Sequence, residues 1–223
     1  MPMGYVGLLQ KSPAAFESSA FGSNTTGSSN ISASTTSVIS VTKPGAIIAV
    51  LEGRHSNWVN TYNVKTITSN LGSTFTEIPG SDTVRGPSGQ RTGHTILFIC
   101  LNPAIGDHTL SGNIQASQSL TQIDVFGAFY SNIVGWQNLT TQSTTGNSAI
   151  NLSITSAVGN IPFIGVNTNN AMAGANWTER ATLASNNGKV GDKGLTATAG
   201  AVSFTTSSTG HTVAACGVDL IAA

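Results

Sequence analysis

Charged residues are scarce in this sequence. Only 8% of the 223 residues are Asp, Glu, Lys or Arg, against about 25% in typical soluble domains, and nine basic residues balance nine acidic ones. Lys and Arg form no cluster along the chain. Because nucleic-acid binding needs several basic side chains along a phosphate track, we expect no nucleic-acid partner. Zero net charge removes the repulsion that keeps molecules apart, so it favours a homo-oligomer or a lattice.

Long apolar runs and cysteines are also few. No run approaches the roughly 18 apolar residues of a membrane span, and the N-terminus lacks the pattern of a signal peptide, so we expect neither membrane insertion nor secretion. The two cysteines, Cys100 and Cys216, lie in apolar, strand-like runs. Buried free thiols are therefore expected more than a disulfide, and the spacing fits no metal site.

Glycine, serine, threonine and asparagine are abundant, and they favour short strands joined by tight turns. No apolar stripe keeps a helical period for three turns, whereas Ala46–Leu51 is a continuous apolar run typical of a strand buried on both faces. Further strands are expected at 37–42, 63–69, 74–78, 94–101, 109–116, 122–130, 149–155, 161–166, 177–183, 201–205 and 212–221. The fold class is therefore all-β.

The second half of the chain echoes the first. Gly72–Glu77 and Gly174–Glu179 share the pattern Gly-x-x-aromatic-Thr-Glu, and each half closes on an apolar-Asp-apolar strand. We expect half-repeats at about 37–131 and 148–223. Each has too few strands to hide its apolar face alone, so the halves should pack around a common core as a two-sheet antiparallel, jelly-roll-like sandwich. Four residues are expected to be structural anchors: Phe75, Trp177, Asp124 and Asp219.

Residues 1–36 differ from the rest. Apolar residues are followed by a Ser/Thr/Asn/Gly tract over 22–36, which is typical of a linker. We interpret 1–36 as an N-terminal arm with a polar linker, and 37–223 as the sandwich. The alternative is an ordinary first strand with a loop. The candidate partner contacts of the arm are Tyr5, Leu8, Leu9, Phe16 and Phe21, which would dock on a neighbouring molecule or on the sandwich itself.

Signals for catalysis are weak. The sequence has no nucleophile elbow, phosphate-binding loop or dinucleotide fingerprint, and its four histidines have no metal-binding spacing. The repeated Glu77 and Glu179 invite a catalytic role, but a surface role is more common beside a turn. Trp58 and Tyr62, four residues apart, would share one face of an extended segment, to stack on sugars or partners or to join the core. We expect no enzyme activity and no cofactor.

The pattern resembles Ser/Thr-rich β-sandwich proteins of tailed-bacteriophage virions. The segments that carry this resemblance are Pro44–Val50, Gly72–Glu77, Gly174–Glu179 and Gly210–Ala223. Similar sandwiches also occur in bacterial surface proteins, so these motifs are only moderately specific.

The resemblance implies a structural protein on the exterior of a capsid or tail, made in the host cytoplasm. A capsid decoration (cement) protein would bind the major capsid protein or other virion proteins and clamp neighbouring subunits. A trimer would fit three-fold positions of the lattice. The alternative is a tail or head-fibre protein that binds carbohydrate on the host surface.

Overall fold

A computed structural model describes residues 12–25, 27–55, 62–86, 92–146, 148–168, 172–183, 188–207 and 212–223. Its regular elements are seventeen β-strands, so the all-β fold class is confirmed. No helix in these ranges is long and apolar enough to cross a membrane.

The two halves of the chain form two sheets with the same strand order. The first sheet has the main path β1 (Ala15–Asn24), β10 (Leu110–Ser131), β4 (Gly45–His55), β8 (Thr92–Leu101) and β6 (Thr76–Glu77). The second has the path β11 (Ile133–Ser143), β17 (Val213–Ala222), β13 (Ile161–Thr168), β15 (Gly188–Asp192) and β14 (Thr178–Leu183). In chain order, both paths run first, fifth, second, fourth, third. The echo in the sequence therefore corresponds to a repeated antiparallel topology.

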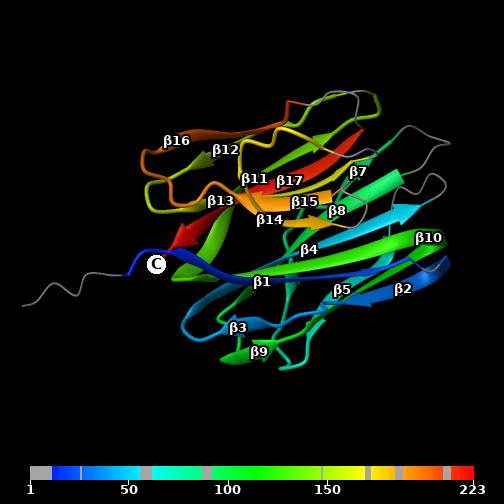
Figure 1. Ribbon diagram of the computed structural model, residues 1–223, viewed down its shortest axis with the longest axis horizontal. Helices are drawn as coiled ribbons and strands as arrows, with labels where there is room; N and C mark the ends of the chain where they lie inside the picture. The colour runs from blue at the N-terminus through cyan, green and yellow to red at the C-terminus, as the bar shows by residue number, and fades with distance from the viewer. Residues whose placement is uncertain are drawn as a thin grey trace, which may run out of the picture.

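The two sheets pack face to face on a shared core. This core draws side chains from β4, β8 and β10 of the first half and from β13, β15 and β17 of the second. Within Ala46–Leu51, even-numbered residues point into the shared core and odd-numbered residues point into a separate first-half core. The run is buried on both faces, as its composition predicts. In Figure 1 the first half lies below and the second above.

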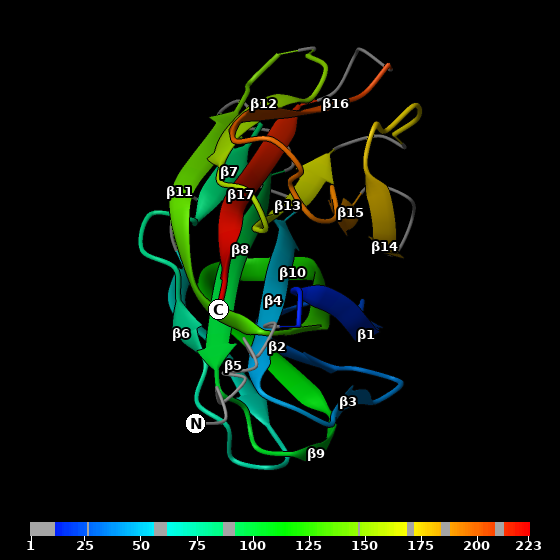
Figure 2. The ribbon, with the colours of Figure 1, turned by 90° about the vertical axis from the view of Figure 1, so that its left-hand side faces the viewer.

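Shorter strands cover the outer face of each sheet. In the first half, β10 bends near its middle (Figure 2), and its residues 110–116 pair with β2 (Ser28–Ser34) on one side and β5 (Tyr62–Ser69) on the other. In the second half, β12 (Asn151–Ser156) pairs with β16 (Gly200–Thr205) over a second-half core. The remaining strands are β3 (Ile39–Val41), which pairs with β9 (Gly106–His108), and β7 (Thr83–Arg85), which pairs with β8.

The expected linker at 22–36 is wrong, because β1 and β2 are strands of the first sheet. Nine register pairs join β1 to β10, and Phe16 and Phe21 on β1 pack against the shared core. The Ser and Asn of β2 alternate with buried Ile31 and Ala33, so this polar tract has one face toward the first-half core. A tract of small polar residues is thus compatible with a strand when every second residue is covered.

Candidate functional site

Buried polar side chains join the two halves at one end of the shared core. Glu52 and Arg54 follow the apolar run of β4, and Asn167 lies on the facing strand β13. The Asn167 Nδ2 donates to Glu52 Oε2 at 2.7 Å, and its Oδ1 accepts from Arg85 Nε at 2.6 Å. One amide of the second half therefore bridges an acid and a base of the first. We call Glu52, Arg85 and Asn167 the inter-half clasp.

Gly93 makes room for this clasp. It lies opposite Arg85 in the pairing of β7 with β8. A Cβ at residue 93 would be 2.5 Å from the Asn167 Oδ1 and 2.7 Å from the Arg85 Nε. Only glycine lets the guanidinium cross β8 to reach the second half, where its Nη1 also donates to Thr212 Oγ1 at 3.5 Å.

Burial dominates the electrostatics of the clasp. Desolvation raises the pKa of the fully buried Glu52 well above its ordinary value, although Arg54 and the Asn167 hydrogen bond act against it. Burial, followed by repulsion from Arg54, lowers the pKa of Arg85 to about 10. The Oε1 of Glu52 has no hydrogen-bond partner in the described part of the chain. The clasp is thus a polar contact with little solvent, and it orients the halves.

A second polar contact closes the shared core near its other end. The Tyr130 hydroxyl of the first half donates to Asp192 Oδ2 at 2.6 Å, and Arg180 donates to both Asp192 oxygens, at 2.6 and 3.1 Å. The Arg180 guanidinium also lies 3.9 Å from the centre of the Phe16 ring. Burial first, and then the Asp192 carboxylate, raises the pKa of Tyr130 well above its ordinary value. Phe16 and Arg180 line a pocket of about 310 Å³ here.

A row of titratable groups runs along the first half near the clasp. His94 Nδ1 lies 2.8 Å from Asp82 Oδ1, and Lys65 bridges Asp82 at 2.8 Å and Glu77 at 2.7 Å. Burial would raise the pKa of Asp82, but its contacts with His94 and Lys65 outweigh burial and lower it.

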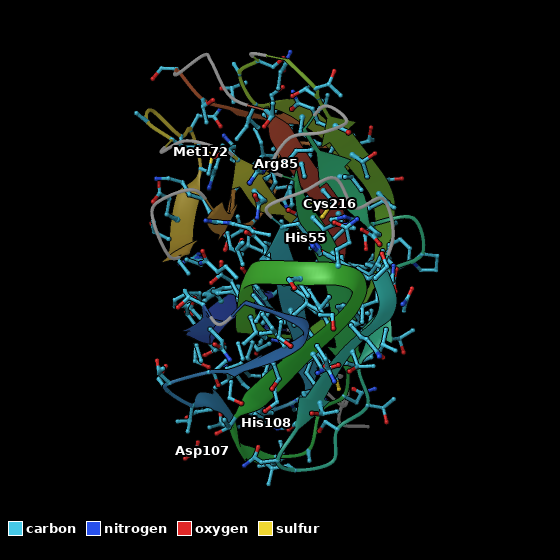
Figure 3. The ribbon with its side chains drawn as sticks, turned by 90° about the vertical axis from the view of Figure 1, so that its right-hand side faces the viewer. His55, Arg85, Asp107, His108, Met172 and Cys216 are labelled. Carbon is cyan, nitrogen blue, oxygen red and sulfur yellow. The ribbon has the colours of Figure 1, made fainter. Side chains whose placement is uncertain are left out.

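Stacked rings continue this row inward. The Tyr62 ring centre lies 4.1 Å from that of His94 and 5.3 Å from that of His55. Burial, with a smaller effect of His94, lowers the pKa of His55 to about 4. Figure 3 shows His55 and Arg85 in the middle of the molecule, whereas Asp107 and His108 lie at the far end of the first half.

The repeated Gly-x-x-aromatic-Thr-Glu motif shares two features in both halves, the glycine conformation and a glutamate–lysine pair. Gly72 and Gly174 have φ values of +70° and +68°, a region that glycine adopts without strain. Each motif glutamate pairs with a lysine: Glu77 with Lys65 at 2.7 Å, and Glu179 with Lys189 at 2.5 Å. The aromatic residues differ in depth. Trp177 is buried in the second-half core, whereas Phe75 is half-buried against the first-half core.

Asp124 and Asp219 are buried in the two closing strands. Burial raises the pKa of Asp124, with hydrogen bonds from Ser23 and Gln122 acting in the opposite direction. Asp219 accepts hydrogen bonds from three side chains, Gln137 at 2.9 Å, Ser156 at 2.6 Å and Asn160 at 2.6 Å. Each aspartate is thus a hydrogen-bond centre within its own half.

The structure does not bring the predicted partner contacts together on one surface. Phe16 and Phe21 are partly buried against the shared core, and Tyr62 is buried among histidines, so these three side chains contact their own fold. Their strands, β1 and β5, each pair with β10 and turn these side chains towards the cores. The other four candidates, Tyr5, Leu8, Leu9 and Trp58, lie outside the described residues.

Cys100 and Cys216 are free thiols and buried. No group of three or more His, Cys, Asp or Glu side chains within the described ranges is arranged to hold a metal ion. Comparison with protein-family models, with curated proteins and with solved structures finds no match to this chain.

Proposed function

We propose that this chain is a non-enzymatic structural protein of a tailed-bacteriophage virion, and that it decorates the capsid and clamps neighbouring subunits. The segments that resemble such proteins support the proposal; in two of them the glycine has a similar positive φ and the glutamate pairs with a lysine. A duplicated body held at a shared core is suited to bearing load between subunits.

One observation carries the structural role: each of the nine Asp and Glu side chains has at least one side-chain partner within the fold. The side-chain partners are Lys43 for Glu17, Asn167 for Glu52, Lys65 for Glu77 and Asp82, Ser40 for Asp107, Gln122 for Asp124, Lys189 for Glu179, Arg180 for Asp192, and Ser156 for Asp219. A general acid or base must be able to exchange its proton with a substrate, and a carboxylate held by a structural partner is poorly placed to do so.

A decoration protein stabilises a shell by mass action. It binds the assembled lattice and not free subunits, so it shifts the equilibrium towards the shell, and many copies on one particle multiply the effect. A neutral exterior rich in Ser, Thr and Asn suits this task, since such a protein faces solvent and neighbouring proteins and not the packaged nucleic acid.

Co-sedimentation with virus particles tests the proposal. Purified chain mixed with expanded capsids that lack decoration should pellet with them at saturating, stoichiometric amounts. A glycan array run in parallel should show no binding; carbohydrate binding without capsid binding would favour the fibre function and contradict decoration. Glu77→Gln and Glu179→Gln should leave capsid binding intact. Loss of a hydrolytic activity in either variant would contradict the non-enzymatic role.

A further inference from the structure

Apolar side chains are exposed at one end of the first half. Leu71, Leu101 and Ile105 expose 42%, 43% and 65% of their surface. Half-buried Phe75 lies beside them, at the edge of the first-half core. We call Leu71, Phe75 and Ile105 the loop-end patch. Leu101 lies nearby on the other face of β8, the face of Leu97 and Ile99.

Leu71 and Ile105 of the loop-end patch come from two adjoining loops. A Cβ on Gly106, next to Ile105, would lie 2.9 Å from the Leu71 Cδ1. The Ala104 amide donates to Ser73 Oγ at 3.1 Å and holds the two loops of the patch together. Beside it is a pocket of about 380 Å³, lined by Ile67 and Phe75 and by the hydroxyl-bearing residues Thr68, Ser69, Ser73 and Thr74.

The chain enters the sandwich at the same end. Ala15 on β1 is in register with Ser131, and Ser131 is in register with Gly45. The Gly45 carbonyl accepts a hydrogen bond from the Asn102 amide, three residues before the patch residue Ile105. Three strand spacings, about 14 Å, therefore separate the start of β1 from the start of the loop that carries Ile105.

We propose that Tyr5, Leu8 and Leu9 of the same chain bind the loop-end patch. These residues lie in the segment 1–11, outside the described residues. Leu9 precedes Pro13 by four residues and Tyr5 precedes it by eight, which span up to about 13 Å and about 26 Å when extended. The patch is thus within reach of Tyr5 and of the residues between Tyr5 and Leu9.

The chemistry of the segment matches the patch. Residues 1–10 carry no charged side chain and include five large apolar ones. Such a segment can bury apolar area against an apolar patch without placing a charge there. The pocket combines the Phe75 ring with several hydroxyl groups, which suits a phenol that is apolar on its faces and polar at its tip. Tyr5 is the one residue of the segment with that combination.

Site-directed cross-linking tests the proposal. In the full chain, Gln10→Cys is combined with Ala104→Cys beside the patch, or with Ala157→Cys as the matched control. Ala104 and Ala157 are both exposed. Ala157 lies in the turn before Asn160, which accepts a hydrogen bond from the Ala222 amide near the entry of the chain. Both positions are thus at the entry end, and the native cysteines are buried in the fold.

A short bismaleimide should link the Gln10→Cys/Ala104→Cys pair within one molecule, and should link the Ala157→Cys pair little. Adding Ile105→Ser should abolish the link, whereas Val158→Ser, at a residue with the same 65% exposure, should leave it. Equal linking of both pairs, or no link at Ala104→Cys, would overturn the proposal. Predominant cross-linked dimers would show that a second copy and not the same chain supplies the segment.

Discussion

Replacing Asn167 by alanine tests whether the inter-half clasp holds the halves together. The substitution removes the donor to Glu52 Oε2 at 2.7 Å and the acceptor of the Arg85 Nε at 2.6 Å. Both remaining groups are buried, so water replaces the amide poorly. A buried polar group without a partner costs about 1–3 kcal/mol, and the two together lower the free energy of unfolding by about 2–5 kcal/mol.

Equilibrium unfolding in guanidinium chloride, followed by tryptophan fluorescence, measures this change. In a chain of this size each kcal/mol shifts the melting temperature by about 2–4 °C, so Asn167→Ala should melt about 4–20 °C lower. The matched control is Asn151→Ala, at an exposed position on β12, which should change stability by less than about 0.5 kcal/mol. If Asn167→Ala is as stable as the control, the clasp contributes nothing and the reasoning is refuted.

Three further changes have defined outcomes. Gly93→Ala should lower the free energy of unfolding by about 1–3 kcal/mol, because the new Cβ would meet the clasp. Gly146→Ala, with open space around residue 146, is the control and should leave the stability unchanged. Equal melting temperatures for the two variants would contradict the crossing of Arg85 over β8. His55→Phe should flatten the dependence of stability on pH between about pH 6.5 and 4. In the wild type, His55 takes up a proton below about pH 6.5 in the unfolded chain but only near pH 4 in the folded chain, so the free energy of unfolding falls by up to about 3 kcal/mol as the pH is lowered. Parallel stability profiles for the two proteins would refute the lowered pKa of His55. Deleting residues 1–27 removes β1, so Phe16 and Phe21 leave the shared core, and this truncation should be less stable than deletion of 1–11 by about 3 kcal/mol or more. Similar melts for both truncations would count against β1 as part of the body.

Much of the fold could be predicted from local patterns. The run Ala46–Leu51 is apolar without interruption because both faces of β4 are covered, and this can be recognised directly in the sequence. The repeated motif also indicated a position that suits glycine in each half, since Gly72 and Gly174 have similar positive φ values. The pairing of each motif glutamate with a lysine was not predicted.

Other strands gave no such signal. The strand β11 lies in a region with no predicted strand, because only a few of its residues, including Trp136 and Leu139, touch the shared core while the others are polar. The strand β15, Gly-Lys-Val-Gly-Asp, has a single apolar side chain, yet all five residues are buried by neighbouring elements. Tertiary packing decides the structure of such segments.

The clasp could not be predicted at all. Glu52, Arg85 and Asn167 are separated by 33 and 82 positions, and no motif links them. Their contact depends on how one sheet lies on the other, and on Gly93 leaving space between them. The only signal in the sequence was the position of Glu52 and Arg54. Charged residues are rare in this chain, and these two directly follow a buried apolar run, which suggests a specific structural role.

Electron cryo-microscopy of virus particles that carry this chain tests the central claim most directly. The account predicts many copies of the paired-sheet body on the outer surface of the capsid, each touching more than one shell subunit. Density confined to the tail, or absence of the chain from purified particles, would contradict it.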